Sequence, residues 1–225
     1  MKLSEIQWTD VDLVPQVVRE RKQETIQGVV MVGRPFVVDA LTYAKAAKQS
    51  LDPSIQVLKK NFAFTYVRLP INIRPRDEYN VHFLSVDVEL MSKDDGAICW
   101  SMEPLRVEQE IQLKTDAELS AGLKLQVAEL GGKESASTEF VVYQPQIEAF
   151  GIGQKDPAWE FRPTKGRVLS GIQLLHMIIQ LPVKSSVIGN ISLKADILAR
   201  GLLWNYRAQT RDNSVVVQRL EIVGR

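Results

Sequence analysis

Cysteine, histidine and long apolar runs are scarce in this sequence. It has one cysteine, Cys99, so no disulfide can form within the chain and a structural zinc site lacks its thiolates. Its two histidines, His82 and His176, are far apart, and neither has a second histidine or a cysteine at metal-ligand spacing. Both lie among apolar neighbours, so we expect them to be core residues. These observations predict no metal site and no cofactor.

Neither sign of charge dominates the chain. Its 28 lysine and arginine residues nearly balance 27 aspartate and glutamate residues, so no overall field attracts nucleic acid or an anionic membrane. A basic cluster over residues 59–76 contains aromatic residues, but Asp77 and Glu78 dilute its charge, and nucleic acid is disfavoured as a partner. Residues 1–6 contain no apolar signal core, and no run of about 18 apolar residues occurs. We therefore expect a cytoplasmic protein.

Catalytic motifs are also missing. The sequence contains no Gly-x-Ser-x-Gly elbow and no Gly-x-x-x-x-Gly-Lys phosphate loop. Carboxylates at a spacing of two, such as Glu108 and Glu110, alternate with apolar residues and are typical of a solvated strand face. Cys99 stands in an apolar run, which favours an inert buried thiol. We predict no catalytic residues and no enzyme activity; an enzyme whose dispersed residues meet only in the fold stays open.

A period of two, typical of half-buried β-strands, dominates from about residue 60 onward. Apolar and polar residues alternate in five segments: 84–90, 105–113, 117–127, 136–142 and 187–197. About ten short strands, most with one polar face, predict a mainly β protein. We expect an antiparallel β-sandwich or flattened barrel with a small N-terminal helical portion.

Three local patterns predict strand arrangements. The Asp95-Gly96 pair supplies turn geometry for a hairpin over residues 83–102. Residues 174–181 are apolar on both faces, which is typical of a strand that is covered on both sides. A turn at 212–214 joins the strand-like run that begins at Leu202 to the run 215–222, which predicts a closing hairpin.

The first 55 residues differ in pattern from the rest. Thr9 and Asp10 predict the cap of a short helix over residues 11–18, and Pro35 stands near the start of a second helix that Asp52-Pro53 ends. We therefore expect residues 1–55 to form a helical portion packed on the sheet and residues 56–225 to form the β domain. A junction between sheets or subdomains is expected near 145–165.

The leading interpretation is a non-enzymatic binding or assembly module. It would recognise another macromolecule through loops or a sheet face, with another protein or a second copy of itself as partner. Aromatic and arginine side chains dominate the energetics of interfaces. The candidates for interaction are Trp8, Trp159, Phe161, Arg162 and Trp204.

An amphipathic β-hairpin over residues 117–142 supports a second interpretation. A strand of a membrane barrel needs about 9–11 alternating residues, and a short turn joins it to its neighbour. The hairpin has this pattern, which predicts a pore-forming type of protein that inserts conditionally into a membrane. Its apolar candidates are Leu119, Leu123, Leu125, Val127, Phe140 and Val142.

Overall fold

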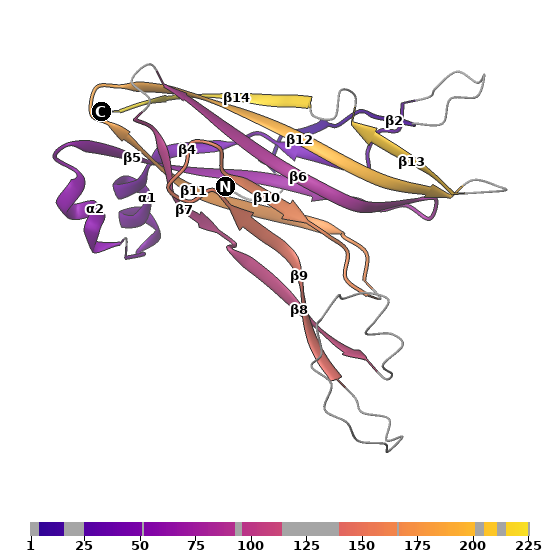
Figure 1. Cartoon of the computed structure of the whole chain (residues 1–225). Helices are drawn as coiled ribbons and strands as arrows, with labels where there is room; N and C mark the ends of the chain where they lie inside the picture. The colour runs from indigo at the N-terminus through magenta and orange to yellow at the C-terminus, as the bar shows by residue number, and fades with distance from the viewer. Residues whose placement is uncertain are drawn as a thin grey trace.

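The computed structural model describes residues 5–15, 25–50, 52–92, 96–113, 140–165, 167–200, 205–210 and 215–224. Within these residues, fourteen strands form two antiparallel sheets, and two short helices accompany them (Figure 1). The predicted mainly β, antiparallel, sandwich-like fold is confirmed. The elements are β1 (Trp8–Asp10), β2 (Leu13–Pro15), β3 (Val30–Gly33), β4 (Phe36–Asp39), α1 (Ala40–Ala47), α2 (Pro53–Leu58), β5 (Phe62–Ile73), β6 (Tyr79–Ser92), β7 (Ile98–Glu103), β8 (Arg106–Leu113), β9 (Phe140–Phe150), β10 (Ala158–Phe161), β11 (Gly171–Pro182), β12 (Ser186–Arg200), β13 (Asn205–Thr210) and β14 (Val215–Val223).

Each sheet is built around one long antiparallel pair. In the six-stranded sheet the order is β1-β3-β5-β11-β7, with β4 also paired to β5. In the eight-stranded sheet the order is β2-β13-β12-β6-β10-β9-β8, with β14 also paired to β12. The pairs β5–β11 and β6–β12 run along nearly the full length of their strands, so they form the centre of the two layers.

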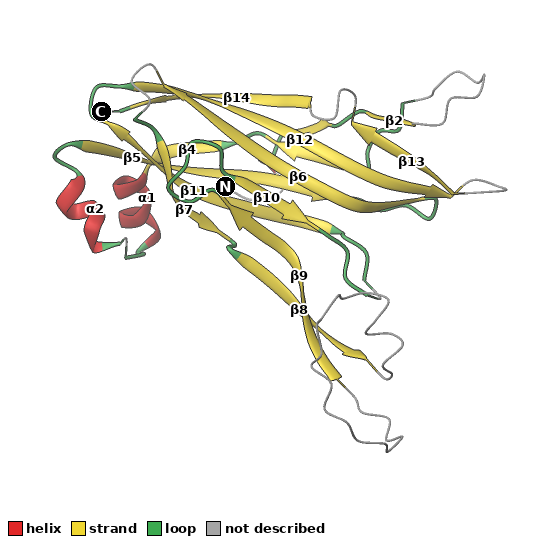
Figure 2. Cartoon of the chain, in the orientation of Figure 1, coloured by secondary structure: helices red, strands yellow, loops and turns green. Residues whose placement is uncertain are grey.

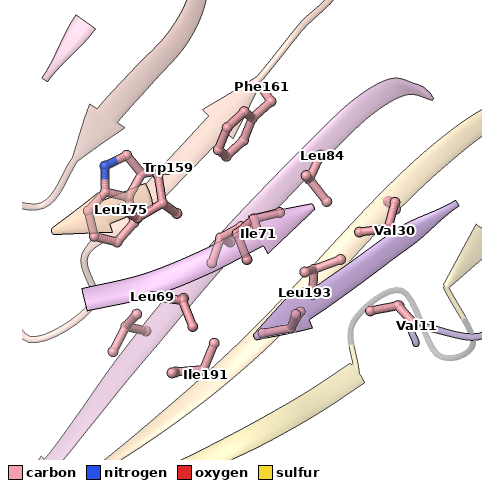
Figure 3. Packing of buried hydrophobic residues seen from close by; sticks show 14 of the residues in the cluster. Val11, Val30, Leu69, Ile71, Leu84, Trp159, Phe161, Leu175, Ile191 and Leu193 are labelled. Atoms are coloured by element: carbon pink, nitrogen blue, oxygen red, sulfur yellow. The ribbon is translucent and has the colours of Figure 1, made fainter. Parts of the chain in front are cut away.

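The main core lies between the two sheets. Residues at alternate positions of β12, among them Ile191 and Leu193, are buried as the period of two predicts. Trp159 and Phe161 on β10 have exposed fractions of 0% and pack in the same cluster (Figure 3). The Trp159 indole donates a hydrogen bond of 3.2 Å to the backbone oxygen of Pro104, so burial leaves its polar group satisfied.

A second cluster covers the outer face of the six-stranded sheet. Ala40 of α1 and Ile55 of α2 pack against Phe64 and Tyr66 of β5, and the two helices lie together at one end of the molecule (Figure 2). Ile178 of β11 packs against this cluster, while its neighbours along β11 face the main core. β11 is therefore covered on both sides over this stretch, as the double-sided apolar run predicts.

The second predicted helix divides into two elements, β4 and α1, and a second helix, α2, follows it. Residues after Pro35 first form β4, and α1 begins at Ala40 because the Asp39 carboxylate accepts a hydrogen bond of 2.8 Å from the Thr42 backbone N–H. The prediction that Asp52-Pro53 ends a helix was wrong. Asp52 caps α2 and Pro53 occupies its first turn, where a missing N–H costs no hydrogen bond.

The helix predicted over residues 11–18 was also wrong in the part that the structure describes. Val11 donates a backbone hydrogen bond to Val30, and Leu13 exchanges two with Ile26, so this stretch is extended. Residues 16–24 lie outside the described residues. Strands in the first 55 residues enter both sheets, β2 the eight-stranded one and β1, β3 and β4 the other.

Two predicted hairpins were wrong because local turn signals do not select pairing partners. β6 lies in the eight-stranded sheet and β7 in the six-stranded sheet, so the chain crosses between layers within 83–102. β13 and β14 pair with successive stretches of β12, at 196–200 and 186–193, rather than with each other. A turn sequence permits a change of direction, and long-range burial decides which strand lies alongside.

We expect Trp159→Ala to lower the free energy of unfolding by about 3–5 kcal/mol, because it opens a cavity in the core and removes the hydrogen bond to Pro104. Urea unfolding followed by circular dichroism measures this loss. Val57→Ala on α2 is the control, since Val57 is 75% exposed, and its effect should stay within about 0.5 kcal/mol. Equal unfolding midpoints for the two variants would contradict this account of the core.

Candidate functional site

A pocket of about 480 Å³ opens on the helix-covered side of the six-stranded sheet. Its walls come from α1, α2 and the segment that joins them, from β5, β7 and β11, and from Ile152 and Gly153 in the loop after β9. The strand register places Arg68, His176 and Glu103 side by side across β5, β11 and β7. Neighbours in register point to the same side of a sheet, so these groups share the face that carries Tyr66.

Three side chains form a hydrogen-bonded chain in this pocket. The rings of Tyr43 and Tyr66 stack with centroids 3.7 Å apart, and the Tyr66 hydroxyl donates to the Tyr43 hydroxyl over 3.2 Å. The Tyr66 oxygen also contacts Nδ1 of His176 at hydrogen-bond distance.

Burial sets the charge states of Tyr66 and His176. It raises the pKa of Tyr66 far above the usual range, and the hydrogen bond to Tyr43 acts in the same direction. Burial also lowers the pKa of His176, and the positive charge of Arg68 lowers it further. Both groups are therefore uncharged near neutral pH.

Arg68 lies next to these hydrogen-bonded side chains but does not line the pocket. Its guanidinium lies 5.2 Å from the centre of the Phe36 ring, in a cation–π contact. Its Nε is buried and has no hydrogen-bond partner among the described residues. The positive charge is thus directed along the sheet toward β4 rather than into the pocket.

Cys99 and His82 have no reactive surroundings. Cys99 is fully buried, its thiol donates to the backbone oxygen of Ser101 over 3.5 Å, and burial raises its pKa to about 12. The thiol is therefore un-ionised and shielded, as predicted. His82 is exposed, so the prediction of a core histidine was wrong there: it lies on the outward side of β6.

A second feature is the hairpin ladder of β8 and β9, which leaves the two-sheet body (Figure 1). The two strands pair from Arg106 with Glu148 to Leu113 with Phe140. β9 pairs with β10 only over 147–150, so among the described strands its outer part, 140–146, pairs with β8 alone.

Polar contacts join the base of this ladder to the segment after β10. Arg162 donates a backbone hydrogen bond of 2.9 Å to the Gln146 oxygen. The hydroxyl of Thr164, a residue only 4% exposed, donates to the side chain of Gln109 on β8. The surface of the ladder is charged, since Arg106 and Glu108 form an exposed ion pair of 2.5 Å that adds little stability.

The predicted interaction residues do not form one surface. Trp159 and Phe161 are core residues with no exposed area, because their strand faces the opposite sheet. Trp8 is half-buried on β1, Arg162 is exposed beside β10, and Trp204 lies outside the described residues.

Two of the six predicted hairpin residues lie in the described part of the ladder. Phe140 and Val142 are in β9, where the register pairs them with Leu113 and Ile111. The other candidates, Leu119, Leu123, Leu125 and Val127, lie outside the described residues.

Sequence analysis missed the pocket. Its main residues, Tyr43, Trp100, Glu103 and His176, come from three elements, α1, β7 and β11, and share no linear motif. Within the described ranges, no group of three or more His, Cys, Asp or Glu side chains is arranged to hold a metal ion. Neither described helix has the length and apolarity needed to cross a membrane.

Comparison with known proteins returns similar structures but no relatives by sequence. No protein-family model matches the chain, and no curated protein matches it. The Clostridium perfringens NetB toxin in its membrane-inserted form is 8% identical, with a TM-score of 0.32, over 96% of this chain and 94% of that one. A structure described as a pore forming protein is 10% identical, with a TM-score of 0.29, over 96% of this chain and 90% of that one.

These findings correct two predictions. Both structures are described as membrane-inserted or pore-forming, which overturns the interpretation as a binding or assembly module that uses loops or a sheet face. The expectation of a cytoplasmic protein is overturned with it. Overlap at these TM-scores carries no argument about individual residues, so the alternative of membrane insertion depends on the geometry of the β8–β9 ladder.

We expect the stability of the chain to fall as the pH drops below the ordinary histidine pKa of 6.5. The pKa of His176 is lower in the folded than in the unfolded chain, so the unfolded chain binds the proton more tightly. The stabilisation is complete above 6.5 and is lost as the pH falls toward the folded-state pKa. Urea unfolding at about pH 7.5 and about pH 5.5 measures the change.

His176→Gln removes this titration, and that variant should lose less stability than the parent between the two pH values. His82→Gln, at an exposed position, is the control and should follow the parent. An unchanged pH dependence in His176→Gln would show that His176 is not the group responsible.

Proposed function

We propose that this chain is a non-enzymatic, pore-forming type of protein that inserts the segment 117–142 into a membrane as a β-hairpin. One observation carries the proposal: β8 and β9 pair from the body of the molecule out to Leu113 with Phe140, in unbroken register from Glu108 onward. The alternating segment is therefore closed at its base by an antiparallel ladder of the kind that a membrane hairpin continues.

The length and pattern of the segment support insertion. Residues 114–139 suffice for two strands of about ten residues and a turn, which matches the thickness of the hydrocarbon core for tilted strands. Apolar residues such as Leu119, Leu123 and Leu125 alternate with polar ones such as Lys124 and Gln126. One face would contact lipid and the other the water-filled lumen of a barrel.

Self-association follows from the chemistry of the backbone. A two-stranded hairpin in lipid leaves the N–H and C=O groups of both edges without partners, and each unsatisfied group costs several kcal/mol. Several copies that pair edge to edge close the sheet and remove those edges. The proposed state is therefore an oligomer whose copies each contribute one hairpin.

The first experiment uses cysteine labelling with an environment-sensitive fluorophore. Leu123→Cys is expected to show a blue-shifted emission when the labelled protein meets liposomes, whereas Lys124→Cys, its neighbour on the polar face, is not. The parent chain is the control for labelling, because the buried Cys99 thiol with its raised pKa should take up no dye. The same response at both positions would exclude a β-hairpin in the bilayer.

The second experiment measures the release of a dye from liposomes by a matched pair of variants. Leu125→Arg places a charge on the lipid-facing side, at a cost of about 2–4 kcal/mol per copy near the middle of the bilayer, and should abolish leakage. Gln126→Arg adds the same charge on the lumen side and should leak like the parent. Absence of leakage by the parent under all lipid compositions, with and without limited proteolysis, would refute the proposed function.

A further inference from the structure

The pocket beside α1 and α2 has the chemistry of a binding site, and the proposed membrane hairpin does not use it. We infer that it binds a small organic cation, an ammonium group on an apolar body, between aromatic walls and carboxylates. The inference does not rest on membrane insertion, because the pocket lies on the six-stranded sheet and the β8–β9 ladder extends from the other sheet.

The size and walls of the pocket suit a small molecule. Ligand sites usually occupy about 300–1,000 Å³, and this pocket measures about 480 Å³. Tyr43 and Trp100 supply aromatic surface, and Ile98 and Ile178 supply aliphatic surface. Phe64 contacts the Trp100 ring in an edge-to-face arrangement with centroids 5.6 Å apart, which holds this wall in place.

Charge selects the class of ligand. Among the described residues that line the pocket, Asp52 and Glu103 are acidic and none is lysine or arginine. The hydrogen bonds from Ser54 to Asp52 lower the pKa of that carboxyl group, so it stays ionised at neutral pH. The charged groups of the lining itself are therefore acidic, which favours a cation over phosphate and carboxylate ligands.

His176 and Arg68 also influence the charge of the pocket. His176 is uncharged near neutral pH, so it adds no positive charge to the pocket. Arg68 does not line the pocket, but its positive charge acts on His176 more strongly than the negative charge of Glu103 does, so the carboxylates favour a cation mainly on the side of Asp52 and Glu103. A cation at the face of Tyr43 or Trp100 would also gain the attraction of the ring.

The test uses three probes of similar shape and different charge: 2-phenylethylammonium, 2-phenylethanol and phenylacetate. Titration calorimetry with the full chain should show saturable binding of the ammonium, affinity at least about tenfold lower for the alcohol, and no binding of the carboxylate. Equal affinities for ammonium and alcohol, or the absence of saturable ammonium binding, would overturn the inference.

Two matched variants locate the site. Glu103→Gln should lower the affinity for the ammonium by about tenfold and leave that for the alcohol unchanged, because it removes one charge and keeps the shape of the side chain. Glu78→Gln, in an exposed position outside the pocket lining, should bind like the parent. Circular dichroism confirms that both variants fold. If Glu103→Gln binds the ammonium as the parent does, the cation does not occupy this pocket.

Discussion

The antiparallel pairing of β5 with β11 is the constraint on which the rest of the structure depends. The two strands run alongside each other from Phe62 with Pro182 to Ile73 with Gly171, at the centre of the six-stranded sheet. Their inward side chains close the core against the second sheet, and their outward side chains carry the helices and the pocket. A shift of one residue in this register would exchange the two faces and disrupt both clusters at once.

The same pairing explains why an apolar sheet face carries a polar site. Arg68, His176 and Glu103 occupy one row across β5, β11 and β7, next to the row that contains Tyr66. The helices bury one end of this face, which lowers the pKa of His176 and raises that of Tyr66, while the other end stays open. A fixed backbone thus places uncharged hydrogen-bonding groups beside ionised carboxylates.

The contacts that hold the ladder of β8 and β9 differ from those that hold the rest of the eight-stranded sheet. Its base belongs to the main core, where Ile147 of β9 is buried and Val107 of β8 packs beside it, whereas farther out it is held by hydrogen bonds of Arg162 and Thr164 and its exposed ion pairs add little stability. The rest of the eight-stranded sheet is held by its buried core. The outer part of the ladder, 140–146 on β9, pairs with β8 alone among the described strands, so its pairing with the body is confined to its base.

Periodicity alone determined the class of the fold and the faces of its strands. The alternation along β12 predicted which side chains are buried, and the apolar run in β11 predicted cover on both sides, because burial follows directly from the pleat of a strand. The amphipathic pattern of residues 117–142 was likewise visible without a structure, although its four candidates from Leu119 to Val127 lie outside the described residues.

Only the tertiary structure decided the partners of the strands and the site between them. Turn sequences at Gly96 and at 212–214 predicted the pairs β6–β7 and β13–β14, but β6 and β7 lie in different sheets and β13 and β14 both pair with β12, because the area buried between sheets outweighs local turn preference. Trp159 was predicted to be an interaction residue, but its strand faces the core and its side chain is buried. The pocket brings Tyr43 of α1 and His176 of β11 together, although the two residues are far apart in the sequence. No local pattern predicts this proximity, because it arises only when the strands pair and the helix packs on the sheet.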